Sequence, residues 1–500
     1  MSGVQSPSGV RLKTFAYENF QGLDTSRDIT SLDTGKDQHL VKLNNGYCDW
    51  RGQIVRDPTA LFRGGEYKIN HVRFFGRDEV VWVEQTGSGL NLHSDRDHVS
   101  QDVHPVNAIV SSTVFNQSVH FAARSRPTYR YDGVNFSRNQ SPALNQLQPA
   151  YMASVQRRLV VAGIPGRETQ IQLSRVDQDE VFADDENPSD ENVLRAGFID
   201  IANLIGTADQ ITGLGSFEQN RLVVFTADRA IIYRIDPDIT RWIIDDNAFI
   251  NIGCASHNTI VQAGTDLLFC SRSGIHSIKR SVDNGILVYS YSMSDKIDLL
   301  YRELFDSVPD PEEISAVFDQ DTAQYHVFFP QQGGFLCKRL TLSLNPEGGE
   351  AQPKFGTGDF LNSRCGAFLA GSLVFGTTGG VYNVNKIESQ DGFVPDMSFT
   401  TPLLWHGSLS DYKETHSLII QAAGKGTLEV ECRNIDGKII GSLVFEVDDT
   451  PDDNSFQDVP LSKQYERKWN HRYKAAQYTF RSKGGGGLLR VIGFALTVRA

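Results

Sequence analysis

The segment IDPDITRWIIDD contains four aspartates whose close spacing could support chemistry: Asp236, Asp238, Asp245 and Asp246. Carboxylates gathered in this way could line a cation or sugar site. Aspartate is also common in turns, because its carboxylate accepts hydrogen bonds from nearby backbone N–H groups. We interpret these residues as turn carboxylates around a strand, with a binding site as the alternative.

Enzymatic signatures are incomplete elsewhere in the chain. The segment SVDNGILVY matches the Ser-x-Asp-x-Gly-x-Thr-Trp turn of sialidase-like blades at Ser281, Asp283 and Gly285 but lacks the Thr-Trp pair. Glycosidases need two positioned carboxylates. The 12 histidines form no H-x-x-x-H or H-x-H pair near acidic ligands, and no G-x-S-x-G or phosphate-cradling loop occurs. We therefore predict no catalytic, cofactor-binding or metal-binding residues, and no enzyme.

Two charged segments have alternative interpretations. Residues 177–191 are acidic, but their carboxylates lack the regular spacing and fixed glycine of a calcium loop, so we favour a solvated insertion. The segment KQYERKWNHRYK (463–474) is basic, and its charged and aromatic residues alternate: Lys463, Tyr465, Arg467, Lys468, Trp469, Arg472, Tyr473 and Lys474. This composition could bind nucleic acid. We favour contact with an acidic patch on a neighbouring subunit.

A hairpin signal recurs seven times, at 78–93, 116–131, 156–173, 219–235, 264–278, 319–340 and 371–384. Each copy has an apolar run, a short turn and a second strand of alternating apolar residues. The first strands begin at Val80, Val119, Leu159, Leu222, Leu267, His326 and Leu373, so the spacings are 39, 40, 63, 45, 59 and 47 residues. A four-stranded propeller blade takes roughly 40 to 50 residues.

The two long spacings coincide with predicted insertions at 176–196 and 281–312. In the second, Ser294 is placed to cap a short helix. Five apolar residues would share one face of that helix, which must be covered by another element: Ile297, Leu300, Tyr301, Leu304 and Phe305.

These patterns predict an all-β protein: a seven-bladed β-propeller with a C-terminal antiparallel β-sandwich and one short helical insertion. We expect the apolar first strands of the hairpins to lie near the propeller axis, buried on both sides. A β-sandwich is the alternative, because regularly spaced hairpins occur in both folds. Residues 1–65 would form an extended segment that supplies a ring-closing strand, 66–397 the propeller and 398–500 the sandwich.

Composition narrows the class of protein. The net charge of −13 opposes non-specific nucleic-acid binding and suits a surface past which DNA must slide, with ordinary solubility as the alternative. The six cysteines are widely separated and contain no C-x-x-C pair, so we expect reduced core residues. The sequence contains no apolar stretch long enough to span a bilayer and no secretory signal, so we expect assembly in a cytoplasm.

Three segments resemble proteins of bacteriophage tails. Residues 20–58 resemble the start of a broad set of tail and virion proteins, including packaged-DNA-stabilisation proteins, through Gly22, Leu23, Asp24, Thr25, Asn44, Asn45, Gly46, Arg51 and Arg56. Residues 249–278 resemble a blade of short-tail nozzle proteins. Residues 397–433 are similar to their C-terminal domain, with matches at Thr401, Pro402, Trp405 and Lys413.

The resemblance implies a structural virion protein that forms the tail nozzle of a short-tailed phage. Its copies, typically six, would form a channel for DNA ejection below the portal and adaptor and would carry attachment points for tail fibres. It implies assembly in the host cytoplasm and no cofactor. The alternative is a sugar-binding or glycan-hydrolysing β-propeller, although the five tryptophans do not recur once per blade as a repeated sugar platform would require.

Overall fold

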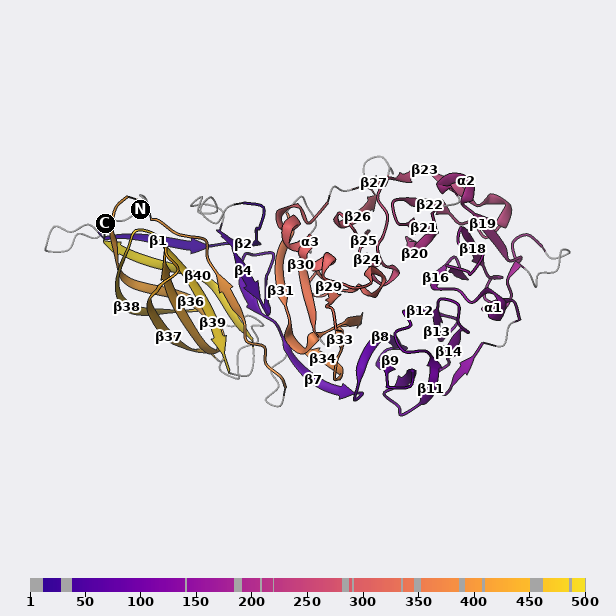
Figure 1. Ribbon diagram of the computed structural model, residues 1–500, viewed down its shortest axis with the longest axis horizontal. Coiled ribbons are helices and arrows are strands. Elements are labelled where there is room, and N and C mark those ends of the chain that lie inside the picture. Colours follow the sequence, from indigo (N-terminus) through magenta and orange to yellow (C-terminus); the bar gives the residue numbers. More distant parts are fainter. Residues whose placement is uncertain are drawn as a thin grey trace.

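The computed structural model describes residues 12–27, 38–139, 142–183, 191–206, 209–218, 220–280, 287–289, 292–333, 336–345, 352–385, 392–406, 410–449, 462–484 and 488–499. The chain forms an elongated molecule with two parts (Figure 1). One part is a ring of β-sheets. The other is a body of longer strands in which the first and last described strands lie together.

Five sheets of the ring each consist of four consecutive antiparallel strands. The first three sheets comprise β8 (Lys68–Phe75), β9 (Glu79–Gln85), β10 (Leu90–Ser94) and β11 (Val99–His104); β12 (Val110–Phe115), β13 (Ser118–Ala123), β14 (Tyr129–Tyr131) and β15 (Phe136–Arg138); and β16 (Tyr151–Val155), β17 (Arg158–Ala162), β18 (Gln170–Leu173) and β19 (Gly197–Asp200). The next two comprise β20 (Ile211–Phe217), β21 (Arg221–Thr226), β22 (Ala230–Arg234) and β23 (Ile243–Ile250); and β24 (Val261–Ala263), β25 (Asp266–Ser271), β26 (Gly274–Arg280) and β27 (Leu287–Tyr289).

A sixth separate sheet joins the two ends of the ring. It contains β32 (Cys365–Leu369), β33 (Ser372–Thr377), β34 (Gly380–Asn385) and β7 (Thr59–Gly64). Strand β7 comes from the N-terminal segment and pairs antiparallel with β34, with Ala60 opposite Val384 and Phe62 opposite Tyr382. Since β7 leads into β8 of the first sheet, it connects the first and last sheets. The described residues thus form a β-propeller with six separate four-stranded sheets.

Four further strands lie between the fifth and sixth sheets in the chain and belong to a larger sheet. They are β28 (Ser315–Asp319), β29 (Gln324–Pro330), β30 (Cys337–Ser343) and β31 (Lys354–Gly358), paired antiparallel in that order. Strand β31 also pairs in parallel with β4 (Lys42–Asn44), where Thr357 lies opposite Asn44. This contact extends the sheet into the second part of the molecule, and the whole sheet has 14 strands.

All seven predicted hairpins are confirmed as antiparallel strand pairs, but one expectation about them is wrong. The hairpins are the second and third strands of their sheets, as in β9–β10 and β13–β14. A preceding strand, which the sequence did not indicate, lies nearer the axis in each case. The apolar runs are buried because they lie between two strands of their own sheet and between two neighbouring sheets; β13 and β17 are buried along their whole length.

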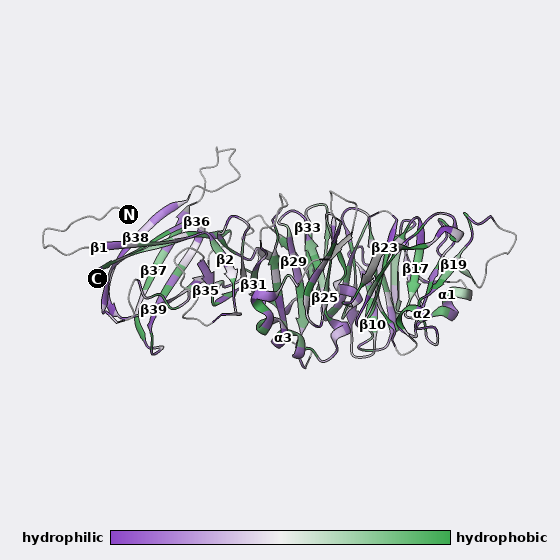
Figure 2. Cartoon of the chain, turned by 90° about the horizontal axis from the view of Figure 1, so that it is seen from above, coloured by the Kyte–Doolittle hydropathy of each residue, from purple (hydrophilic) through white to green (hydrophobic). Residues whose placement is uncertain are grey.

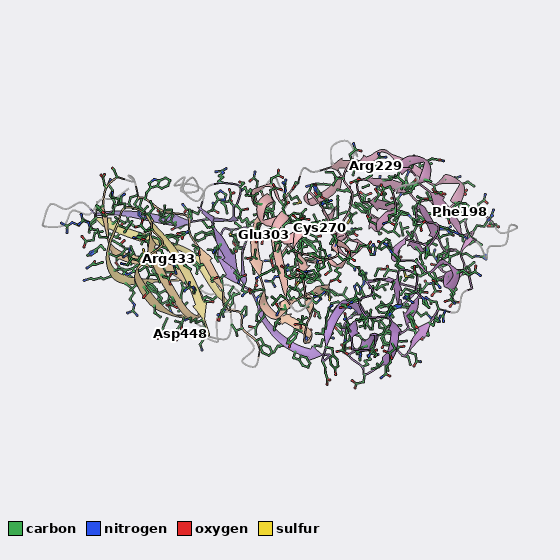
Figure 3. All side chains as sticks on the ribbon, in the orientation of Figure 1. Phe198, Arg229, Cys270, Glu303, Arg433 and Asp448 are labelled. Atoms are coloured by element: carbon green, nitrogen blue, oxygen red, sulfur yellow. The ribbon has the colours of Figure 1, made fainter. Side chains whose placement is uncertain are left out.

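Apolar clusters fill the spaces between neighbouring sheets. Val81 and Leu92 of the first sheet pack with Val119 and Phe121 of the second. Trp82 of the first sheet packs with Val374 of the last, so the ring is also closed by side-chain packing. The outer strands are more polar and exposed, and Phe198 on β19 lies at the outer rim (Figure 3). Figure 2 shows the hydrophobic strands crossing the thickness of the ring.

The second part is built around one very long strand. It contains β35 (Ser398–Thr400), β36 (Lys413–Asn434), β37 (Ile439–Asp449), β38 (Lys463–Tyr473), β39 (Ala476–Lys483) and β40 (Leu489–Arg499). The first half of β36 pairs with β38 and β40, and its second half with β37 and β39. The halves meet at Gly424, where φ is +101° and a Cβ atom would lie 1.7 Å from the Leu488 carbonyl oxygen.

The N-terminal segment contributes more strands to this second part than to the ring. Strand β1 (Leu12–Glu18) pairs with β40, β4 pairs with β35, and β6 (Ile54–Arg56) pairs with β40 and with β5 (Gly46–Cys48). Strands β2 (Phe20–Leu23) and β3 (Gln38–Leu40) pair in parallel with each other. Strand β7 alone among these N-terminal strands belongs to a ring sheet.

The helical insertion covers one side of the ring. It contains η4 (Asp295–Ile297), α3 (Asp298–Asp306) and η5 (Pro311–Glu313). The predicted apolar face is buried in the cluster that also holds Phe329 and Ile275. The predicted Ser294 cap is wrong, because the Ser294 hydroxyl accepts a hydrogen bond from the backbone N–H of Ile275 at 3.1 Å and makes no cap contact. The remaining helical elements are short: α1 (Pro142–Leu147), α2 (Ala202–Ile205), η2 (Ile239–Arg241), η3 (His257–Thr259) and η6 (Phe360–Asn362).

The acidic insertion at 176–196 is only partly solvated. Asp179 lies 3.3 Å from Arg130. Phe182 is fully buried in the cluster between the second and third sheets, so the beginning of the insertion is anchored to the ring wall. Residues 184–190 lie outside the described residues.

Candidate functional site: the axial cavity of the ring

A cavity of about 620 Å³ lies on the axis of the ring. Its wall is formed mainly by the first strands of successive sheets: β8, β12, β16, β20, β24, β28 and β32. The sheets surround this axis in Figure 1. An axial cavity is where a propeller brings many strands together, which makes it a candidate binding site.

The wall of the cavity carries little charge. Arg73 is the one lining residue, among those the structure describes, that belongs to the Asp, Glu, Lys or Arg group. His71 bonds Ser112 Oγ at 2.7 Å, and burial, together with the charges of Arg73 and His257, lowers the pKa of His71 to about 3. His71 is therefore neutral near pH 7. The acidic surface expected along a DNA channel is not found on this wall.

The short helix η3 lies across one end of the cavity. Asn258 Nδ2 donates to the Val110 carbonyl oxygen at 3.1 Å and so connects the segment before β24 to β12 of another sheet. His257 Nδ1 accepts from the Leu214 N–H at 3.2 Å, and burial and Arg73 lower the pKa of His257 to about 4. Asn258 lines both the axial cavity and two smaller cavities, so η3 separates these spaces.

The two smaller cavities, of about 30 and 270 Å³, form a polar mouth. Arg124 donates to Glu312 at 2.9 Å and to the Tyr151 hydroxyl at 2.8 Å. Arg364 donates to Glu313 at 3.1 Å. Both mouth glutamates are therefore held by arginines from other sheets.

The mouth pairs its carboxylates with guanidinium groups. A glycosidase mechanism needs one carboxylate that gives a proton and a second that acts as base or nucleophile. Glu312 and Glu313 each form an ion pair with an arginine, and burial raises the pKa of Tyr151. The mouth can offer guanidinium, amide and hydroxyl groups to a polar ligand.

Two of the aspartates singled out in the sequence, Asp236 and Asp238, lie in the connection between β22 and β23. Asp238 caps η2 by accepting from the Thr240 N–H at 2.9 Å, and Asp236 accepts from the Asp238 N–H at 2.9 Å. These two residues are confirmed as turn carboxylates. The side chains of Asp245 and Asp246, and the sialidase-like residues Ser281, Asp283 and Gly285, lie outside the described residues.

The basic segment forms strand β38, an outer strand of the second part. Trp469 and Tyr473 are buried in the core, while Arg467, Lys468 and Arg472 point to solvent. The aromatic residues therefore cannot serve together as stacking platforms for bases, which removes the main support for nucleic-acid binding by this segment. Tyr412 is exposed beside Arg472, whose guanidinium carbon lies 4.6 Å from the ring centroid.

Among the described residues, no group of three or more His, Cys, Asp or Glu side chains is arranged to hold a metal ion. None of the helices described is both long and apolar enough to cross a bilayer.

All six cysteines are free and buried. Cys270 lies inside the ring wall (Figure 3). The expectation of reduced core residues is thereby confirmed. No sequence pattern indicated the arginines, glutamates and Asn258 of the mouth, because they come from separate connections of the ring.

The fold and the axial site define the class of protein as a β-propeller. No family model and no curated protein matches the sequence. Among solved structures, virginiamycin B lyase from Staphylococcus aureus is 10% identical with a TM-score of 0.38, over 65% of this chain and 97% of that one. The extracellular domain of a hybrid two component system from B. thetaiotaomicron is 11% identical with a TM-score of 0.41, over 92% and 62%. YCF48 from Cyanidioschyzon merolae is 11% identical with a TM-score of 0.34, over 65% and 98%.

Proposed function

We propose that this chain is a structural, non-enzymatic virion protein that forms the tail nozzle of a short-tailed phage. The observation that carries the proposal is the single hydrogen-bonded sheet that runs from β28 in the ring to the strands of the second part. A sheet shared in this way resists movement of one part against the other, because bending it would break strand pairing. Each copy is a rigid wall segment. The resemblance of residues 20–58, 249–278 and 397–433 to tail proteins supports the same function.

We also propose that β28–β31 is one blade of a seven-bladed propeller. Ala316 and Val317 of β28 line the axial cavity alongside the first strands of the six separate sheets. Phe328 of β29 packs against Phe375 of β33, in the same way that other neighbouring sheets pack. The second part is proposed to be a β-sandwich, supported by the division of β36 between two sets of partners.

In this proposal DNA passes through the centre of a ring of six copies. The axial cavity of a single propeller is crossed by η3, which makes it unsuited to DNA passage. The net charge of −13 would weaken adhesion of DNA to the surrounding walls, because few cations are available to displace counterions from phosphates. Adaptor proteins and tail fibres are the expected partners at the two faces of such a ring.

The exposed basic residues of β38 provide a specific test of assembly. Strand β38 pairs with β36 along one edge and has no strand partner along the other among the described residues. We expect the Arg467→Glu, Arg472→Glu double variant to assemble more weakly than the natural chain because both residues would face an acidic neighbour. Lys438→Glu, in the turn before β37, is the matched control and should leave assembly unchanged.

Assembly is measured by sedimentation of the purified full chain and by electron microscopy of particles. We expect a hexamer whose shape fits the sixfold density at the end of a phage tail. A chain that remains monomeric at high concentration and is absent from purified particles would overturn it. If the chain hydrolyses a glycan, and this activity is lost in Glu312→Gln but kept in Glu446→Gln, the nozzle proposal would be replaced by a hydrolase. Saturable glycan binding without turnover would replace it with a sugar-binding function.

A further inference from the structure

A further cavity of about 240 Å³ lies where the ring meets the second part of the molecule. Its polar wall comes from the N-terminal segment, from β28–β30 and from β40: Tyr47, Arg56, Asp57, Asp319, Thr322, Gln324, His326, Arg339 and Arg490. Leu373, Phe375 and Val384 of the last ring sheet form an apolar side. The cavity is therefore a place where four segments that are distant in sequence bring charged groups together.

Cations outnumber anions on this wall. Arg56, Arg339 and Arg490 contribute three guanidinium groups, against the two carboxylates of Asp57 and Asp319. Arg339 is paired with Asp57. The Asp319 carboxylate accepts from the Asp321 N–H at 3.0 Å and from Thr322 Oγ1 at 2.6 Å. An excess of buried positive charge is costly unless an anion accompanies it.

Several polar nitrogen atoms on the same wall lack a hydrogen-bond partner among the described residues. Arg339 Nε, Arg490 Nε and His326 Nε2 are buried and have no hydrogen-bond partner among the described residues. Arg339 and His326 are each 4% exposed. Buried polar groups in native proteins are nearly always hydrogen-bonded, so three of them around one cavity indicate a missing acceptor.

The guanidinium of Arg339 is held in place before any ligand binds. It lies over the ring of Phe375, with 5.6 Å between the guanidinium carbon and the ring centroid. A Cβ atom at Gly358 would lie 2.5 Å from Arg339 Nη2, so a larger residue there would displace the guanidinium from its present position. His326 Nδ1 bonds Thr341 Oγ1 at 3.1 Å, which leaves Nε2 on the opposite side of the ring. Preorganised donors of this kind lose little entropy on binding.

We propose that this cavity is a binding site for a small oxyanion, a phosphate or carboxylate group, held by Arg339, Arg490 and His326. Guanidinium groups present parallel N–H donors that match the oxygens of phosphate and carboxylate. The volume is below the roughly 300 to 1,000 Å³ of sites for drug-sized ligands, which favours a small group. The net negative charge of the whole chain gives no general attraction to anions, so binding here depends on the local geometry.

The test is isothermal titration of the full chain with inorganic phosphate, at constant ionic strength set by chloride. We expect one saturable site per chain and affinity at least about tenfold weaker in Arg490→Gln, because a charge-assisted contact is lost. Arg481→Gln is the matched control. Arg481 lies on β39, bonds Glu431 at 3.4 Å and is outside the cavity, so the affinity of this variant should match that of the natural chain.

Two further measurements keep the proposal testable if Arg490→Gln is unstable. Arg490→Lys keeps the charge but loses the planar fork, so phosphate should bind with intermediate affinity. Phosphate should also raise the melting temperature of the natural chain more than it raises that of Arg490→Lys. Equal shifts in both, no saturable heat, or equal affinities in all the variants would overturn the proposal.

Titration with acetate and glucuronate distinguishes a ligand that carries a carboxylate, such as an acidic sugar, from a ligand that carries a phosphate. Tighter binding of glucuronate than of phosphate would assign the site to an acidic sugar, and the reverse order would assign it to a phosphorylated ligand. Because these experiments do not depend on oligomeric state, their outcome is distinct from that of the nozzle proposal.

Discussion

Asp57 and Arg339 form an ion pair in which the side chains are 3% and 5% exposed, although 282 residues separate them in the sequence. Asp57 follows β6, which pairs within the second part of the molecule, and Arg339 lies on β30 of the strand quartet β28–β31. The ion pair therefore connects the two parts of the molecule in the same region where the shared sheet connects them.

Removing one partner of this pair should be strongly destabilising. Arg339→Met leaves the Asp57 carboxylate buried without its cation, and a broken buried pair costs about 3 to 5 kcal/mol. Urea unfolding at pH 7 measures the loss of unfolding free energy. Arg124→Met is the control, because Arg124 and Glu312 are 43% and 28% exposed and such pairs contribute at most about 1 kcal/mol. Equal losses in the two variants would contradict a special role for the buried pair.

Glu84 should make the first ring sheet sensitive to acid. Burial by itself raises the pKa of Glu84, but hydrogen bonds from His93 and from the N–H groups of Glu66 and Tyr67 outweigh it and lower the pKa to about 2. The N–H distances are 2.6 and 2.8 Å. A lowered carboxyl pKa stabilises the fold above the ordinary value of 4.5, and this stabilisation is lost as the pH falls towards 2.

We therefore expect Glu84→Gln to reduce the free energy of unfolding by about 1 to 3 kcal/mol at pH 7. The difference from the natural chain should shrink as the pH is lowered below 4.5. Denaturant unfolding at a series of pH values checks this. A difference that stays constant down to pH 2 would show that the charge of Glu84 is unimportant.

The strand that joins the ends of the ring should be essential for its stability. The Ala60 N–H donates to the Phe393 carbonyl oxygen at 3.0 Å, and the Ala60 side chain is fully buried. Ala60→Pro removes this donor and leaves the Phe393 carbonyl oxygen without it, which should cost about 1 to 3 kcal/mol. Ala60→Ser keeps the N–H and serves as the control. Thermal unfolding compares them, and a melting temperature for Ala60→Pro equal to that of Ala60→Ser would contradict the prediction.

The six cysteines should be inert in the folded chain. Burial raises the pKa of the Cys254 thiol to about 11 and that of Cys48 to about 12, so almost no reactive thiolate exists near neutral pH. A colorimetric thiol reagent should label less than one cysteine per native chain and all six after unfolding in guanidinium. Rapid labelling of one or more thiols in the native protein would show that part of the ring opens readily.

Local patterns in the sequence determined the repeating part of the fold. Alternating apolar residues and short turns identified all seven hairpins, because a hairpin is formed by residues close together in the chain. The apolar face of Tyr301, Leu304 and Phe305 was visible for the same reason, since helix periodicity is local. The burial of the cysteines was predicted from their wide separation and the lack of a C-x-x-C pair.

The tertiary structure decided where these elements sit and which polar groups meet. The sequences of strands such as β12 and β28 show no distinctive pattern of apolar and polar residues. One edge of each strand faces the axial cavity, and neither apolar nor polar residues dominate in it. The pairing of β1 with β40 and the meeting of Asp57, Arg339 and Arg490 join residues hundreds of positions apart. Such contacts depend on how the ring closes and how the two parts pack, and no local periodicity encodes them.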